Sequence, residues 1–367
     1  MTQVIATINI TIGTKAQLIK MAPVIRRLHE SGHPFSFVWT GQHAETIDLL
    51  LEAFKLPEPT YLLEYHSEAN TKKKLWKWAA ACWKSLHLER DLFNEKKIVV
   101  VHGDTLSTLI VALAARKFGA HVAHIEAGLR SQTFFDPFPE EIIRRITSRI
   151  ASYHYCPDSW SKRNLRTLAQ DLSIVDTGGN TLLDSLRDAL TTKSILPTTQ
   201  AKPFGIFSMH RFENIGATRK FFGLIERICE ISKIIDIRFI MHPATRHRLE
   251  VTGLLSRVQE TPGIIVTPRM DYPDFIYLVR QARFLITDGG SNQEEASYLG
   301  IPCLLLRKNT ERQEGLTDNV VLSRLEPTII SDFVTKSANS TWQLKPIPHH
   351  SPSAIIVADL IERAKAI

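Results

Sequence analysis

The chain has 367 residues, a length that suits two domains of ordinary size better than one. Hydrophobic residues make up 44% of it and charged residues 23%, which are the proportions of a soluble globular protein. The formal net charge of +7 suits nucleic acid, acidic lipid or a phosphorylated small molecule. Because no long block of Lys and Arg and no nucleic-acid-reading motif occurs, we expect no nucleic-acid partner.

Apolar, often β-branched runs alternate with stretches of helical spacing along the first half of the chain. Strands are predicted at 4–12, 35–40, 98–101 and 121–125, and two further strand–helix units run through 153 and through 175–180. Helices are predicted at 15–29, from beyond 43 to 51, and at 69–88, 107–117 and 139–150. Pro139 suits the first position of the last of these helices.

A polar segment with two prolines, 191–204, interrupts this series and is typical of a linker. A second alternating series follows, with strands predicted at 205–209, 237–241, 264–267, 284–287 and 301–306. We therefore place an N-terminal domain at 1–190 and a C-terminal domain at 205–350. A last helix is predicted at 353–367, and packing of this helix on the first domain is compatible with the sequence.

Repeated β–α units on both sides of a linker predict an α/β protein with two doubly wound, Rossmann-like parallel-sheet domains. Ligands of such folds bind beyond the carboxyl ends of the strands. The distinctive polar residues lie mostly at those ends, so we predict a binding cleft between the domains. Motifs for other chemistries are missing, since the sequence has no GxGxxG after its first strand, no HExxH, CxxC pair or EF-hand spacing, and no GxSxG. We expect no metal and no resident cofactor.

The four cysteines are scattered, and Cys82, Cys156 and Cys303 have apolar or aromatic neighbours. They are predicted to be reduced core thiols, as in a cytosolic protein. The N-terminus lacks the pattern of a secretory signal peptide, and no apolar run approaches the ~20 residues of a membrane span. We therefore predict a cytoplasmic location.

The segment 288–291, Asp-Gly-Gly-Ser, follows an apolar run and precedes a helical stretch. Two glycines let the backbone turn tightly and let a bulky anion approach the main chain. The free N–H groups and the positive dipole end of the helix then face that anion. Glu295, a turn further on, is placed to accept hydrogen bonds from sugar hydroxyls. The segment predicts a nucleotide-diphosphate site, with an ordinary strand-to-helix turn as the alternative.

Acidic residues follow several predicted strands of the first half. Asp104 and Glu126 come directly after two strands, and Glu140 and Glu141 open a helix. Carboxylates gathered in one cleft repel, so the pKa of at least one is expected to rise, which suits acid–base catalysis near neutral pH. The alternative is that each is a helix cap or a first-turn acid at a helix dipole.

Basic residues are distributed around these acids, namely Lys15, Lys20, Arg130, Arg144, His210, Arg211, Arg307 and Arg312. A diphosphate needs cations from several directions, and arginine offers it bidentate hydrogen bonds. His210 follows the first strand of the second domain and has Arg211 beside it. We therefore interpret His210 as functional rather than structural.

A series of short motifs, in a fixed order over about residues 4–315, resembles the UDP-N-acetylglucosamine 2-epimerase family. The motifs lie at 13–15, 20–23, 101–105, 124–130, 137–144, 179–181, 210–214, 288–295 and 310–312. Each is weak alone, but the combination is specific. The resemblance implies a glycosyltransferase-B-like pair of Rossmann domains with the active site between them, usually in a homodimer.

The resemblance further implies inversion at C2 of a UDP-linked 2-acetamido sugar, in the synthesis of surface-polysaccharide precursors. Early cleavage of the anomeric C–O bond to UDP leaves positive charge at C1, which acidifies the C2 hydrogen. Elimination gives a 2-acetamidoglucal and UDP, and UDP then adds back with the proton delivered to the other face. This chemistry needs carboxylates on both sides of the sugar and stabilisation of the departing diphosphate.

Positions that match the family's motifs carry the roles that the resemblance implies. The acid–base set is Asp104, Glu126 and Glu140, and His210 lies near the diphosphate. The remaining substrate contacts are Gly289, Gly290, Ser291 and Arg312 for phosphate, Glu295 for ribose, Phe275 for uracil, and Lys15, Lys20, Arg144 and Arg211.

The chain departs from the family at several of these positions. The usual Gly-Thr-Arg-Pro-Glu appears at 13–17 as Gly-Thr-Lys-Ala-Gln, so a planar arginine fork is replaced by a point charge. Ser-Gly-Gly becomes Gly-Gly-Ser at 289–291, and Thr-Glu-Arg-Pro becomes Thr-Glu-Arg-Gln at 310–313. The segment with which bacterial members bind a second, activating UDP-sugar survives only in part at 42–45, so we do not expect that activation. These changes bear on the sugar more than on the reaction.

The lysine- and tryptophan-rich stretch 72–87 departs further. Trp76, Ala80, Trp83 and His87 share one helical stripe, with lysines around it. A helix that packs in the core or in a dimer is one interpretation. The other is a basic aromatic face that contacts a membrane or glycan-assembly proteins.

Several alternative functions remain open at this point. A hydrolysing epimerase lets water capture C1 and releases N-acetylmannosamine, and a related enzyme epimerises a modified UDP-diacetamido uronic acid. A glycosyltransferase on the same fold is disfavoured, because transfer does not require three acids from the first domain. A non-catalytic UDP-sugar-binding protein is disfavoured by the intact acids and His210.

Overall fold

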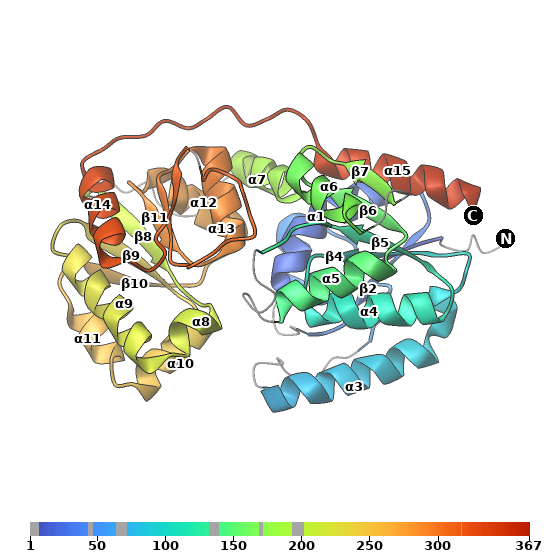
Figure 1. The fold of residues 1–367 in the computed structure, drawn as a ribbon, viewed down its shortest axis with the longest axis horizontal. Helices are drawn as coiled ribbons and strands as arrows, with labels where there is room; N and C mark the ends of the chain where they lie inside the picture. The colour runs from blue at the N-terminus through green and yellow to red at the C-terminus, as the bar shows by residue number, and fades with distance from the viewer. Residues whose placement is uncertain are drawn as a thin grey trace. The chain divides into compact units, whose positions relative to one another are not determined.

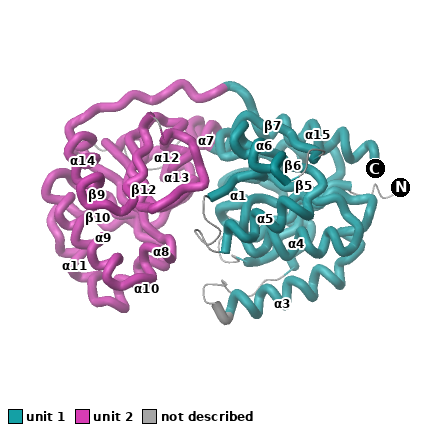
Figure 2. Tube along the Cα trace, viewed as in Figure 1, with its two compact units in different colours: residues 1–185, 349–367 teal, residues 186–348 magenta. Residues whose placement is uncertain are grey.

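The computed structural model describes residues 7–42, 47–63, 72–131, 139–168, 172–192, 202–316 and 318–367 (Figure 1). The chain forms two compact units, residues 1–185 with 349–367 and residues 186–348 (Figure 2). Each unit contains one parallel sheet flanked by helices. The predicted fold class, two doubly wound α/β domains, is confirmed.

The sheet of unit 1 has seven strands in the order β3-β2-β1-β4-β5-β6-β7, all parallel. The strands are β1 Ile8–Ile12, β2 Phe35–Trp39, β3 Tyr61–Leu62, β4 Ile98–His102, β5 His121–Ile125, β6 Tyr153–Cys156 and β7 Ser173–Asp176. The helices that complete the unit are α1 Lys15–Glu30, α2 Ile47–Phe54, α3 Lys72–Leu88, η1 Arg90–Phe93, α4 Leu106–Lys117, α5 Glu140–Ile150, α6 Ser159–Arg166, the start of α7 Leu182–Thr191, and α15 Pro352–Ala366.

The strand order of unit 1 reverses between β1 and β4. Helices cover both faces of such a sheet, so its central strands are continuous apolar runs, and every residue of β1 and β4 is buried. The connection from β1 leads to β2 on one side, and the connection from β4 leads to β5 on the other, which opens a crevice at the carboxyl ends of β1 and β4. The start of α1 with Lys15 and the β4–α4 loop with Asp104 lie at this crevice.

The sheet of unit 2 repeats the plan with six parallel strands in the order β10-β9-β8-β11-β12-β13. The strands are β8 Phe204–Ser208, β9 Asp236–Met241, β10 Ile264–Pro268, β11 Leu285–Thr287, β12 Cys303–Leu305 and β13 Val320–Leu322. The helices are α8 Phe212–Ile215, α9 Thr218–Ile231, α10 Pro243–Val251, α11 Leu255–Glu260, α12 Tyr272–Gln281, α13 Gly290–Leu299 and α14 Pro327–Ala338. Its reversal falls between β8 and β11, which carry His210 and Asp288 just beyond their carboxyl ends.

Helix α15 packs against α1 in unit 1, although nearly the whole chain separates the two helices. Its buried apolar residues include Ile356 and Leu360. The Tyr155 hydroxyl donates to Asp359 at 2.7 Å, and the Ser353 N–H donates to Asp184 at 2.9 Å. Most of the predicted linker, 193–201, lies outside the described residues.

Helix α3 buries a different stripe from the one that the aromatic spacing singles out. Trp78, Cys82 and Leu86 pack in the core, whereas Trp76 is 74% exposed. The Trp78 indole donates to the Thr40 carbonyl at 2.9 Å, which ties the helix to the end of β2. All four cysteines are free and buried, which confirms the prediction for Cys82, Cys156 and Cys303. Within the described parts of the chain, no helix has the length and apolarity that crossing a membrane requires.

Two helix starts differ in detail from the prediction. Pro139 is the N-cap of α5 rather than its first residue, and Glu140 begins the helix. Thr105, not Asp104, caps α4, because its hydroxyl accepts from the Thr108 N–H at 3.3 Å. The alternative of Asp104 as a helix cap is therefore wrong, and its carboxylate is available for another contact.

Candidate active site

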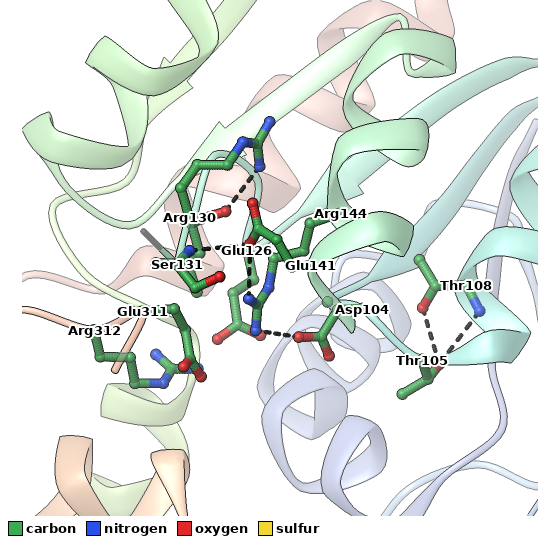
Figure 3. Close-up of polar contacts among 12 residues, drawn as sticks. Asp104, Thr105, Thr108, Glu126, Arg130, Ser131, Glu141, Arg144, Glu311 and Arg312 are labelled. Carbon is green, nitrogen blue, oxygen red and sulfur yellow. Dashed lines mark hydrogen bonds and ion pairs between the residues drawn. The ribbon is translucent and has the colours of Figure 1, made fainter. Parts of the chain in front are cut away.

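Asp104, beyond the end of β4, forms an ion pair with Arg144 of α5 (Figure 3). The Asp104 side chain is 27% exposed, whereas the Arg144 side chain is 5% exposed. Arg144 also contacts Glu141 at 3.3 Å, and the fully buried Glu141 accepts from Arg145 at 2.7 Å and from the Ser131 N–H at 3.0 Å. Glu141 thus holds the guanidinium of Arg144 in place on helix α5, and the guanidinium in turn contacts the Asp104 carboxylate beyond the end of β4.

Glu126 follows β5 and is held by two donors. Its Oε1 accepts from Lys20 Nζ at 2.8 Å and from Asn180 Nδ2 at 2.7 Å. His102 Nε2 lies 3.4 Å from the other carboxylate oxygen. The Glu126 carboxylate can come close to the backbone at residue 103 because that residue is glycine. The φ of Gly103 is +67°, and a Cβ there would lie 3.3 Å from Glu126 Oε2. The carboxylate is nearly buried, and its orientation is set from three elements.

The loop that carries Lys15 is tied to the loop that carries Asp104 through Gln17. The Gln17 amide donates to the His102 carbonyl at 2.8 Å and to the Thr105 hydroxyl at 2.9 Å, and its oxygen accepts from the Gly13 N–H at 2.9 Å. Gln17 is 2% exposed. Where the family has glutamate, this chain therefore has a buried amide whose NH2 group and oxygen both form hydrogen bonds. The NH2 group donates to a backbone carbonyl.

Glu140 lies at the start of α5 and is half-buried. Its neighbour Glu141 makes the buried contacts of that turn. The first two residues of the family motif at 137–144 lie outside the described residues, as do 43–45 of the segment that the family uses for an activating UDP-sugar. Lys15 is the first residue of α1 and is half-buried.

Asp288 organises the strand ends of unit 2. Its buried carboxylate accepts from the N–H groups of His210 and Arg211 at 2.9–3.1 Å and from Asn214 Nδ2 at 2.9 Å. His210 Nδ1 lies 3.2 Å from Asp288 Oδ1, and the His210 ring stacks on His242 at 5.0 Å between centroids. Desolvation lowers the pKa of His210, and the negative charge of Asp288 opposes this shift.

The glycine turn leads into the N-terminus of α13, which no side chain caps. A Cβ at Gly290 would lie 3.1 Å from Arg312 Nε, so glycine lets the guanidinium reach the start of the helix. Arg312 is 5% exposed and pairs with the buried Glu294 at 2.9 Å. Uncapped N–H groups, the helix dipole and an arginine are together a suitable environment for an anion, and Ser291 is the second residue of the helix.

Glu295 is 3% exposed and accepts from Asn292 Nδ2 at 2.8 Å. Burial, followed by the charge of Glu295 and a hydrogen bond with it, raises the pKa of Tyr272 well above its usual value. Tyr272 begins α12, and Phe275 lies nearly a turn further along that helix, half-buried. The residues predicted for ribose and uracil thus come from adjoining parts of unit 2.

Within each unit, the structure brings several predicted residues together and adds others. Lys20 meets Glu126, and Arg144 meets Asp104, so the predicted cluster of repelling carboxylates is instead matched with cations. The contacts that the sequence did not predict come from His102, Glu141, Asn180, Asp288 and Asn292. A usable signal existed for most of them, since they lie inside the short motifs. Among the described residues, no group of His, Cys, Asp and Glu forms a metal site.

The fold defines the class of protein, a two-domain α/β protein of the glycosyltransferase-B-like kind. A glycosyltransferase of kitacinnamycin shares it, with a TM-score of 0.57 at 10% identity over 98% of this chain and 99% of that chain. The family model described as UDP-N-acetylglucosamine 2-epimerase matches residues 26–351. The chain belongs to the UDP-N-acetylglucosamine 2-epimerase family.

Relatives with sequence similarity agree with this assignment. The UDP-N-acetylglucosamine 2-epimerase of Methanocaldococcus jannaschii is 33% identical over 323 residues, which cover 84% of this chain and 85% of that protein. A crystal structure of the epimerase from this organism, in complex with UDP-GlcNAc and UDP, superposes with a TM-score of 0.83 at 30% identity. The superposition covers 97% of this chain and 99% of that one.

Proposed function

We propose that this protein inverts C2 of UDP-N-acetylglucosamine to give UDP-N-acetylmannosamine, a precursor for surface polysaccharide, by eliminating UDP and adding it back. The observation that carries the proposal is the family match over residues 26–351, which includes every strand of the two sheets except β1. Cleavage of the anomeric C–O bond releases UDP, and a base removes the C2 proton to give 2-acetamidoglucal. The reverse addition returns UDP to C1 and a proton to the opposite face of C2.

Unit 1 supplies the acid–base groups in this proposal. Asp104, Glu126 and Glu140 are the acid–base set, and proton transfer by such positioned carboxylates requires that they hold their place during both steps. Arg144 fixes Asp104 through a partly exposed ion pair, and Lys20 fixes Glu126 through a buried one. Lys15, in the neighbouring loop, is a further substrate contact.

Unit 2 supplies the nucleotide site. The N-terminus of α13 at Gly289, Gly290 and Ser291, with Arg312, holds the diphosphate in this proposal. Glu295 binds the ribose and Phe275 the uracil. A departing diphosphate beside His210 and Arg211 favours the protonated imidazole, so His210 adds positive charge as UDP leaves.

The reaction is tested by incubating the protein with UDP-GlcNAc in deuterated water and following the sugar by NMR. Deuterium at C2 of a retained UDP-sugar is expected, because the elimination exchanges that proton with solvent. Asp104→Asn and Glu126→Gln are each expected to abolish exchange while leaving UDP affinity nearly unchanged. Exchange at the parental rate in either variant contradicts the acid–base assignment.

The same experiment separates the alternative reactions. Free N-acetylmannosamine with UDP indicates hydrolysis, and the absence of exchange at saturating UDP-GlcNAc excludes epimerisation of this sugar. Exchange on a diacetamido uronic acid nucleotide alone moves the substrate to that class.

We also propose that the protein is a homodimer, which the family resemblance supports. Helix α3 offers a surface for it, since Trp76 is 74% exposed and Leu88 is 73% exposed. The exposed Lys74, Lys77 and Lys84 make that surface basic. Contact of this surface with a membrane or glycan-assembly proteins is the alternative prediction.

A further inference from the structure

Asn292 connects the end of β11 to Glu295 through its side-chain amide. The N–H of Gly289 donates to the Thr287 hydroxyl oxygen at 3.1 Å, and that hydroxyl donates to Asn292 Oδ1 at 3.0 Å. Asn292 Nδ2 then donates to Glu295 Oε2 at 2.8 Å. Three hydrogen bonds therefore run in one direction, from the glycine turn to the carboxylate.

Hydrogen-bond chemistry allows the amide only one orientation. An ionised carboxylate accepts and cannot donate, so the NH2 group must face Glu295. The Thr287 hydroxyl already accepts from Gly289, which leaves its proton for the amide oxygen. Glu295 is 3% exposed, so protein donors rather than bulk water decide where its carboxylate points.

Gly289 is coupled sterically to this arrangement. Its φ of −81° and ψ of 126° suit any residue, so the turn itself does not require glycine. A Cβ at this position would lie 2.8 Å from Asn292 Oδ1. Because the amide is bonded at both ends, it cannot move aside without losing the contact with Thr287 or with Glu295.

We propose that Asn292 is a positioning residue for nucleotide binding, which aims the carboxylate of Glu295 at the ribose hydroxyls in the space that Gly289 leaves open. The inference rests on the proposed function, in which Glu295 binds ribose. It explains why glycine takes the first place of the turn, where the family has serine. Its consequence is that Asn292 determines how strongly the site prefers UDP over 2′-deoxy-UDP.

The test is calorimetric titration of the full-length protein with UDP and with 2′-deoxy-UDP. Asn292→Ala removes a hydrogen bond to a charged group, so UDP is expected to bind about tenfold more weakly. The affinity for 2′-deoxy-UDP is expected to fall less, which lowers the preference for the ribonucleotide. Asn339→Ala is the matched control, because Asn339 is an exposed asparagine at the end of α14 in the same unit.

Asn292→Asp adds a pH profile that a purely structural role would not produce. The aspartate keeps the acceptor toward Thr287 but sets a second carboxylate against Glu295, and the repulsion favours a shared proton. Relative to the parent protein at the same pH, the variant is expected to lose UDP affinity as pH rises and to regain it as pH falls.

A double-mutant cycle with Gly289→Ser tests the steric coupling between Gly289 and Asn292. In the parent background the serine is expected to weaken UDP binding, because its Cβ displaces the amide of Asn292. In the Asn292→Ala background the same serine is expected to add little further loss, since the obstructing oxygen is gone. The difference between the two effects measures the coupling of the two positions.

Each outcome decides a separate claim. Unchanged affinity and unchanged ribose preference in both Asn292 variants overturn the positioning role while leaving the nucleotide site intact. Equal effects of Gly289→Ser in the two backgrounds overturn the coupling. Failure of the parent protein to bind UDP overturns the proposed function and this inference together.

Discussion

Glu126 holds a left-handed backbone conformation, with a φ of 65°, directly after β5. A non-glycine residue in this region costs about 1–3 kcal/mol, so surrounding contacts must hold it there. Lys20 and Asn180 supply them, from α1 and from the loop before α7. The conformation turns the carboxylate back toward the end of β4, where Gly103 leaves room for it.

Asn180 offers a test of this arrangement. Asn180→Ala removes a buried hydrogen bond to a charged group, which is expected to lower the free energy of unfolding by about 1.5–3 kcal/mol. The exchange rate at C2 is expected to fall while UDP affinity stays unchanged, because Asn180 lies in unit 1 and the proposed nucleotide site lies in unit 2. Urea denaturation and deuterium exchange measure the two effects. If the folded Asn180→Ala variant exchanges the C2 hydrogen at the parental rate, Glu126 does not need the hydrogen bond from Asn180.

At this scale, the motifs predicted the residues but not their partners. Glu140 and Glu141 are indistinguishable in the sequence, and only the helical geometry of α5 shows that Glu141 is the buried acid beside Arg144. Lys20 could be assigned to a phosphate from its charge alone. Its ion pair with Glu126 depends on the approach of α1 to β5, which residue spacing does not encode.

A buried histidine connects the ends of strands β4 and β5, which Asp104 and Glu126 follow. His124 Nε2 lies 2.8 Å from the Gly103 carbonyl, and burial lowers the pKa of His124 to about 3. The imidazole is therefore neutral in the folded protein and donates one proton to that carbonyl. The contact joins the end of β4 to β5 at the place where Asp104 and Glu126 begin.

This element predicts a pH dependence of stability. Between about pH 6.5 and pH 3 the unfolded chain binds a proton at His124 that the folded protein excludes, so the free energy of unfolding falls as pH falls. His124→Gln removes this contribution and is expected to flatten the slope by up to about 1.4 kcal/mol per pH unit. Denaturation at several pH values measures it, and identical slopes contradict the neutral buried imidazole.

Strand and helix positions were predictable because parallel strands are apolar throughout and helices are periodic. Their ends were less so. The sequence left Asp104 open as an alternative cap of α4, whereas the hydroxyl of Thr105 takes that place. The stripe of α3 was only partly informative, since Trp83 packs against the core cluster whereas Trp76 is exposed.

For the whole molecule, the proposed homodimer predicts a mass of twice 41.6 kDa in light scattering. Trp76→Ala is expected to raise the dissociation constant, because it removes the most exposed large apolar side chain of α3. Ile234→Ala, at a 59% exposed position of unit 2, is the control and is expected to leave the mass unchanged. A monomer that binds anionic vesicles through Trp76 favours the membrane alternative instead.

The return of α15 to unit 1 bears on the order in which the protein matures on the ribosome. Unit 2 is an insertion within unit 1, so its last residue, Pro348, is synthesised before any part of α15. Residues 1–185 are therefore synthesised first, and the surface of α1 that α15 contacts stays uncovered until the whole of unit 2 has been synthesised. Synthesis of the last helix completes the first unit, and a nascent chain that stops short of it has a complete unit 2 and an incomplete unit 1.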